Sequence, residues 1–151
     1  MGRIIKFRAW DAEEGTMFVS HDKDFTSVYG RTRDGEERHG SLGVVLQEFP
    51  LMQFTGLLDK NGREIYEGDV LEGFYDYGHG KWWMTCKVFY DHSGFRLEVI
   101  EGDENREKMV NYADFIESDG SIFEEKEVIG NVHQNPEFLL NPTTVSAPKS
   151  K

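Results

Sequence analysis

The stretch LLDKNGREIYEGDVLEG, from Leu57 to Gly73, decides the fold. Its Asn61-Gly62 pair is the strongest short signal for a β-hairpin turn. Apolar residues follow in two short runs, Ile65-Tyr66 and Val70-Leu71. The Gly68-Asp69 pair separates these runs at a point where a bulge or a sharp bend fits. We therefore interpret the stretch as a corner of a β-structure, in preference to a binding loop or a metal site.

Calcium is the first alternative that the acids of this stretch raise. An EF-hand loop needs oxygen ligands at its positions 1, 3 and 5, glycine at position 6 and glutamate at position 12. A loop that starts at Asp59 has Glu64 at position 6 and Val70 at position 12. A loop that has Gly62 at position 6 starts at Leu57. Both registers fail, so a solvated turn is the preferred interpretation.

Zinc is the second alternative, because His79, Cys86 and His92 lie near one another in the sequence. Structural zinc sites use ligand pairs about two to five residues apart, which orient two ligands from one turn. These three residues provide no such close pair, and Cys86 is interpreted more simply as a small core residue. We predict neither a metal nor a cofactor.

Catalytic motifs are missing from the sequence. It contains no G-x-S-x-G nucleophile elbow, no P-loop and no G-x-G-x-x-G phosphate cradle. Its many carboxylates are typical of a solvated acidic surface. We therefore do not predict an enzyme, and a hydrolase with dispersed carboxylates is the weakest of the functional hypotheses.

Short β-like runs lie on both sides of the corner. Ile4–Trp10 and Thr16–Val19 predict an N-terminal β-hairpin. Further runs predict strands at Phe25–Tyr29, Trp82–Phe89, Phe95–Ile100 and Glu127–Val132. The run Leu42–Leu46 is too short to decide between strand and helix. Tyr112–Ile116 predicts a short helix with Asn111 as its N-cap.

These patterns predict a mainly β fold, either a small barrel or a sandwich, with an N-terminal β-hairpin and at most one or two short helices. Residues 67–71, a loop and a strand that ends at 88–91 resemble the first turn of SH3-like barrels. We expect a single β-rich domain over residues 1–140, with a variable excursion at 20–50, and a disordered tail over residues 141–151.

Composition limits the partners and the compartment. Twenty-eight acids against seventeen bases give a net charge of −11 over 151 residues, which disfavours nucleic acid as a partner. The single cysteine cannot form an intramolecular disulfide, which is typical of a reducing cytoplasm. No apolar run approaches the roughly 18 residues that cross a bilayer. We expect a cytoplasmic protein that makes no membrane contact.

The candidate binding residues are aromatic and close together in the sequence: Tyr75, Tyr77, Trp82 and Trp83. On a strand, Trp82 and Trp83 point to opposite faces, so we expect one in the core and the other at a protein–protein or subunit contact. Aromatic side chains also stack on single-stranded bases where cations flank them, and here only Lys81 and Lys87 do so. A small-barrel nucleic-acid-binding protein is therefore the alternative function.

Four segments resemble the YopX family, small proteins encoded mainly by phages and prophages of Gram-positive bacteria. The segments are Ile5–Asp11 (IKFRAWD), Leu51–Leu57 (LMQFTGL), Asp59–Val70 (DKNGREIYEGDV) and Val128–Glu137 (VIGNVHQNPE). They follow the family's order, whereas residues 20–50 and 72–125 match no motif. The resemblance implies a phage or prophage protein of unknown biochemical role that forms a homo-oligomer, with a trimer as one form. It supplies no catalytic residues.

We therefore expect a non-enzymatic accessory protein that acts by protein–protein binding or self-association, with a host or phage protein as its partner. Its acidic surface favours basic partners, and mimicry of nucleic-acid charge is one form of this hypothesis. The shared segments hold turn residues, glycines and core hydrophobics, which supports the interpretation of Leu57–Gly73 as architecture.

Overall fold

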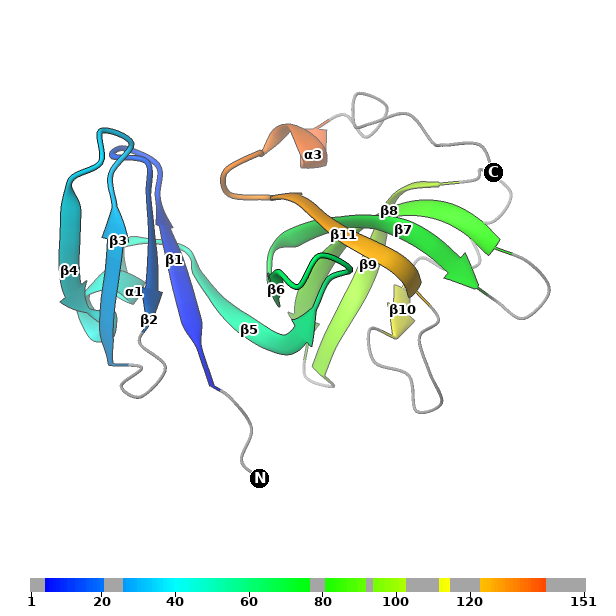
Figure 1. Cartoon of the computed structure of the whole chain (residues 1–151), viewed down its shortest axis with the longest axis horizontal. Coiled ribbons are helices and arrows are strands. Elements are labelled where there is room, and N and C mark those ends of the chain that lie inside the picture. The colour runs from blue at the N-terminus through cyan, green and yellow to red at the C-terminus, as the bar shows by residue number, and fades with distance from the viewer. Residues whose placement is uncertain are drawn as a thin grey trace. The chain divides into compact units, whose positions relative to one another are not determined.

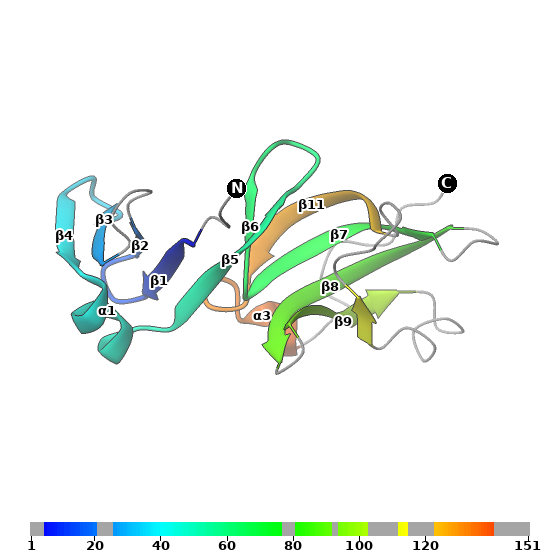
Figure 2. The same ribbon diagram turned by 90° about the horizontal axis from the view of Figure 1, so that it is seen from below.

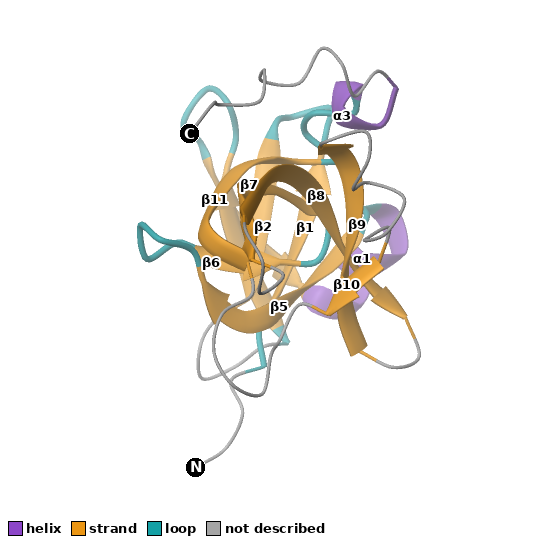
Figure 3. Cartoon of the chain, turned by 90° about the vertical axis from the view of Figure 1, so that its right-hand side faces the viewer, coloured by secondary structure: helices purple, strands orange, loops and turns teal. Residues whose placement is uncertain are grey.

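Antiparallel strands dominate the computed structural model, which describes residues 5–20, 26–76, 81–91, 94–102, 112–114 and 123–140 (Figures 1 and 3). The strands are β1 (Phe7–Asp11), β2 (Thr16–Ser20), β3 (Ser27–Arg31), β4 (Glu37–Ser41), β5 (Leu51–Leu58), β6 (Glu64–Tyr66), β7 (Asp69–Asp76), β8 (Lys81–Asp91), β9 (Gly94–Gly102), β10 (Tyr112–Asp114) and β11 (Phe123–Asn131). The helices are α1 (Leu42–Glu48) and α3 (Glu137–Leu140). The predicted mainly β fold with an N-terminal hairpin is confirmed.

The chain divides into two compact units, Met1–Leu57 and Leu58–Lys151. The described strands form two antiparallel sheets, with the strand orders β4-β3-β2-β1-β5-β6 and β10-β9-β8-β7-β11. Each order ends at two different edge strands, so neither sheet closes into a barrel within the described residues. No helix among those residues is long and apolar enough to span a membrane.

In the N-terminal unit, α1 supplies part of the apolar core over the β1–β4 sheet. Leu42 and Val45 lie one helical turn apart and join the buried side chains Ala9, Phe18 and Val28. The segment Leu42–Leu46, which the sequence could not assign to a strand or a helix, is part of this helix. Its helix has a specific start, because the Ser41 side chain accepts a hydrogen bond from the Val44 N–H at 3.4 Å.

In the second unit, β7 lies between β8 and β11, and β8 in turn pairs with β9 (Figure 2). Every residue of β7 from Asp69 to Phe74 is buried, so both faces of this strand are covered. Cys86 of β8 is also fully buried, as predicted for a core residue. Burial raises the pKa of its thiol far above the usual range, so the thiol is inert at neutral pH.

Two local expectations differ from the structure. The predicted helix at Tyr112–Ile116 is wrong over Tyr112–Asp114, which forms β10 and pairs with Arg96–Glu98 of β9. Pairing with a neighbouring strand outweighs the weak preference of so short a segment for a helix. The predicted strand near Phe25–Tyr29 lies at Ser27–Arg31, and its hairpin partner β4 was not predicted.

Candidate functional site

Asp59 organises the turn that opens the corner. One of its carboxylate oxygens, Oδ1, accepts hydrogen bonds from the backbone N–H groups of Asn61 at 2.8 Å and Arg63 at 2.9 Å. The other, Oδ2, accepts from the buried N–H of Val128 in β11 at 3.0 Å, 69 residues away in sequence. Gly62 completes the turn with φ +83°, a value that suits glycine. The turn is thereby joined to β11.

These bonds also set the charge state of Asp59. Burial raises the pKa of its carboxyl group, but the N–H donors of Val128, Arg63 and Asn61 and the charge of Arg63 together lower it below the ordinary value. Each donor is satisfied by the ionised carboxylate. The carboxylate of Asp59 therefore has a structural role in this turn, which agrees with the interpretation of Leu57–Gly73 as a corner.

The second half of the corner is a bend at Glu67-Gly68, one residue before the Gly68-Asp69 pair at which the sequence predicted it. Gly68 has φ +88°, its N–H donates to the Val88 carbonyl at 2.8 Å, and its carbonyl accepts from the Val132 N–H at 2.9 Å. Asp69 Oδ2 accepts from the Tyr66 N–H at 2.8 Å. The bend therefore connects β6, β8 and the end of β11.

The segment after β11 has its own structural asparagine. Asn131 Oδ1 accepts from the N–H groups of His133 at 3.0 Å and Gln134 at 2.8 Å, which closes a turn before α3. A Cβ atom added at Gly130 would lie 2.5 Å from Asn135 Oδ1 and 2.8 Å from Phe138 Cε2. This segment needs a glycine at that position because the returning chain packs directly against it.

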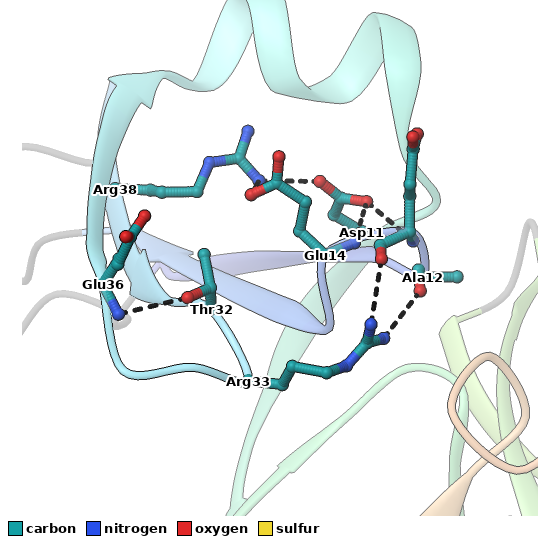
Figure 4. Close-up of polar contacts among 8 residues, drawn as sticks. Asp11, Ala12, Glu14, Thr32, Arg33, Glu36 and Arg38 are labelled. Carbon is teal, nitrogen blue, oxygen red and sulfur yellow. Dashed lines mark hydrogen bonds and ion pairs between the residues drawn. The ribbon is translucent and has the colours of Figure 1, made fainter.

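An ion pair connects the first turn of the N-terminal unit to β4 (Figure 4). Asp11 is buried and accepts hydrogen bonds from the N–H groups of Glu13 at 2.9 Å and Glu14 at 3.2 Å through Oδ1. Its Oδ2 accepts from Arg38 Nη1 at 2.7 Å. The Arg38 guanidinium also lies 4.7 Å from the centre of the Phe18 ring, a cation–π contact.

Burial raises the pKa of Asp11. The hydrogen bonds from Arg38, Glu14 and Glu13 and the charge of Arg38 lower it by more than that, so the pKa lies below its ordinary value. Arg33 strengthens the same turn by donating to the carbonyls of Glu13 at 3.1 Å and Ala12 at 3.2 Å (Figure 4). Both arginines are occupied by structural contacts. This cluster therefore holds the turn and leaves no catalytic pair in it.

The opposite face of the same sheet is hollowed. Because side chains alternate along a strand, Phe18 and Val28 face α1 while Met17, Val19 and Tyr29 face away from it. A cavity of about 250 Å³ lies on that outer face, lined by Met17, Val19, Tyr29, Gly30, Arg31, Glu37 and His39. All of its lining comes from β2, β3 and β4.

The hollow has an apolar floor and a charged rim. Met17 and Val19 are partly buried, and Tyr29 is 46% exposed. Arg31 and Glu37 form an ion pair at 2.8 Å, and His39 Nε2 lies 4.0 Å from the other Glu37 oxygen. This arrangement can bind an apolar group and hydrogen-bond a polar one, but it contains no nucleophile with an adjacent base. It is the candidate functional site.

The aromatic residues predicted for binding belong to the second unit. Trp83 is partly buried and packs edge-on against Phe74, with ring centres 4.9 Å apart. Tyr75 and Trp82 are opposite each other in the β7–β8 register, but their side chains lie outside the described part of the structure, as does Tyr77. The binding role of the four stays a prediction. The structure instead draws attention to Met17, Tyr29 and His39, whose grouping depends on strand pairing that no sequence motif reveals.

Within the described ranges, no three His, Cys, Asp or Glu side chains are placed to hold a metal ion together. His79 and His92, weighed above as zinc ligands, fall outside those ranges.

Comparison with known proteins identifies the family. A family model described as YopX protein matches residues 6–140. The crystal structure of protein EF1440 from Enterococcus faecalis is 28% identical over 91% of this chain and 99% of that chain, with a TM-score of 0.47. No curated protein matches. Since the family model spans most of the sequence, this chain belongs to the YopX family.

Proposed function

We propose that this protein is a non-enzymatic accessory protein of phage or prophage origin, which acts inside the bacterial cell by binding another protein through the outer face of its N-terminal sheet. The observation that carries the proposal is the hollow on that face, with its floor of Met17, Val19 and Tyr29 and its rim of Arg31, Glu37 and His39. An apolar centre within a polar, solvated rim is the common organisation of protein–protein interfaces.

The size of the hollow favours a protein partner over a small ligand. Its volume of about 250 Å³ lies below the range of roughly 300–1,000 Å³ that small-molecule sites occupy. Its rim side chains are also widely exposed: 65% for Arg31, 63% for Glu37 and 68% for His39. A shallow site of this kind fits one or two side chains of a protein surface better than a cofactor enclosed on all sides.

Affinity purification from host lysate tests this function. The tagged wild-type chain is compared with Tyr29→Glu, which places a charge on the floor, and with Val44→Glu as the matched control. Val44 is an exposed apolar residue of α1, 58% accessible and not part of the lining. A stoichiometric partner retained by wild type and Val44→Glu, lost by Tyr29→Glu and resistant to nuclease is the expected result.

Two other outcomes of that purification have definite meanings. Recovery that disappears with nuclease would support the alternative, nucleic-acid binding, in place of protein binding. Equal recovery by Tyr29→Glu and wild type would show that the partner binds elsewhere and would remove the hollow from the proposal.

A further inference from the structure

We propose that the hollow binds an extended, positively charged segment of a partner protein, which adds as a strand to the open edge of β4. This inference rests on the proposed function and specifies its partner. It combines three observations on the N-terminal unit: an edge strand, outward-pointing backbone groups on that strand, and an adjacent hollow for a side chain.

The first observation is the position of β4. It stands at the end of the strand order β4-β3-β2-β1-β5-β6 and has β3 as its one ladder neighbour among the described residues. An edge strand presents unpaired N–H and C=O groups that another extended chain can use.

The second observation is the register of the β3–β4 ladder. The Thr32 N–H donates to the Glu36 carbonyl at 2.9 Å, and the Leu42 N–H donates to the Thr26 carbonyl at 2.6 Å. Hydrogen-bonded pairs recur at every second residue of an antiparallel ladder, so Arg38 and Gly40 bond towards β3. The backbone N–H and C=O groups of Glu37 and His39 consequently point away from β3, towards the free edge.

The third observation is that the same residues line the hollow. The side chains of Glu37 and His39 form its rim on the edge side. A residue of an added strand that pairs with His39 projects its side chain onto this same outer face, next to His39 at the rim of the hollow and one strand further out than Tyr29. Strand addition uses backbone bonds for affinity and a neighbouring pocket for side-chain selectivity, and β4 offers both.

Charge decides which kind of segment fits. Around this edge there are three arginines, of which Arg31 pairs with Glu37, Arg38 is shared by Asp11 and Glu14, and Arg33 donates to backbone carbonyls. Six acids lie in the same turns and strands (Asp11, Glu13, Glu14, Asp34, Glu36 and Glu37), so the acids outnumber the arginines here, in a chain of net charge −11. This field attracts Lys and Arg and repels a second copy of the chain. The occupant is therefore a basic segment with an apolar side chain at alternate positions.

The experiment uses the full-length protein, the labelled peptide Lys-Val-Lys-Phe-Lys-Val-Lys and its acidic counterpart Glu-Val-Glu-Phe-Glu-Val-Glu. His39→Pro removes the outward N–H without breaking a β3–β4 bond, since Pro is accepted where an edge N–H faces solvent. His39→Ala loses the same imidazole but keeps the N–H and is the matched control. Thermal unfolding first establishes that both variants are folded.

We expect the basic peptide to bind, the acidic peptide not to bind, and His39→Pro to weaken the basic peptide by about tenfold relative to His39→Ala, as the loss of an intermolecular hydrogen bond predicts. Equal affinity in the two variants, equal binding of the two peptides, or no binding of the basic peptide to wild type would each overturn strand addition. A wild-type dimer that His39→Pro dissociates would overturn the basic occupant, because the added strand would then come from a second copy. In any of these cases, a lysate partner that binds wild type but not Tyr29→Glu would still support the proposed function.

Discussion

Each unit of this protein has a tight turn organised by a buried aspartate, but the two aspartates are satisfied in different ways. Asp11 accepts hydrogen bonds from two N–H groups of its own turn and forms an ion pair with Arg38. Asp59 accepts hydrogen bonds from two N–H groups of its own turn and from the N–H of Val128 in β11. Two local bonds form the turn in both cases. The third partner differs, and it determines whether the turn responds to salt or depends on a distant strand.

The largest effect is expected for Asp59→Ala. The substitution leaves three backbone donors without their acceptor, one of them the buried N–H of Val128, and should lower the free energy of unfolding by about 3 kcal/mol or more. Urea unfolding followed by circular dichroism measures this. Asp59→Asn, which keeps one carbonyl acceptor, should cost less. An Asp59→Ala variant as stable as wild type would show that the turn does not depend on its carboxylate.

The strand packing of the first unit is tested next by Gly30→Ala. A Cβ atom there would lie 2.5 Å from the Met17 carbonyl oxygen and 2.8 Å from Thr16 Cγ2, so β2 must move, at a cost of about 1–3 kcal/mol. Gly40→Ala is the control, because its Cβ would make only an ordinary 3.5 Å contact with Val45 Cγ2. Equal melting temperatures for the two variants would contradict the packing described for Gly30.

Arg38→Met tests most directly whether the contacts of Asp11 and Asp59 differ in their dependence on charge. Methionine keeps apolar contact with Phe18 but removes the charge that Asp11 binds, so we expect a loss of about 1–2 kcal/mol. The difference between wild type and Arg38→Met should shrink in 1 M salt, because salt screens a partly exposed ion pair. The cost of Asp59→Ala should stay the same in that salt. A salt-independent cost of Arg38→Met would mean that packing, and not charge, is what Arg38 contributes.

Acid should weaken both turns. The folded pKa values of Asp11 and Asp59 are lowered, so the ionised carboxylates bind fewer protons in the folded state than in the unfolded state. Their contribution to stability is complete above the unfolded pKa of about 3.9 and is lost as the pH falls through the folded values. Urea unfolding between pH 7 and pH 2.5 should show this decline. In the Asp11→Asn, Asp59→Asn double variant the decline below about pH 4 should be shallower.

The smallest effect on stability is expected at the rim of the hollow. Arg31 and Glu37 are each more than 60% exposed, so replacing either with Ala should change the unfolding free energy by less than about 1 kcal/mol. The same substitutions should alter partner binding if the outer face is an interface. Substitutions at the rim should thus change binding with little change in stability, whereas substitutions at Asp11 and Asp59 should change stability.

Local signals in the sequence predicted much of this architecture. The Asn61-Gly62 turn, the first hairpin and the bend at Gly68 were all expected, because each depends on the conformational preferences of neighbouring residues. The partner of Asp59 could not be predicted in the same way, since no spacing rule connects it to Val128, 69 residues later. The structure has the predicted corner in this stretch, and the bond that joins it to β11 became visible only in three dimensions.

The candidate site was less accessible to sequence reasoning. Its floor and rim come from three strands, and Tyr29 meets His39 only through the β3–β4 register. β4 has the sequence ERHGS, which lacks the apolar alternation of a typical strand because it is an exposed edge. Tyr112–Asp114 shows the reverse problem, since its apolar pattern was interpreted as a helix and pairing with β9 made it a strand.

The long-range bond of Asp59 also orders events during synthesis. A ribosome releases residues 59–63 well before Val128, so the carboxylate can form its two local bonds early but must wait for β11 before the corner is complete. In the first unit, Arg38 follows Asp11 by only 27 residues, so that turn can close while the second sheet is still being translated. The contact of Asp11 can therefore form during synthesis before the contact of Asp59 is possible.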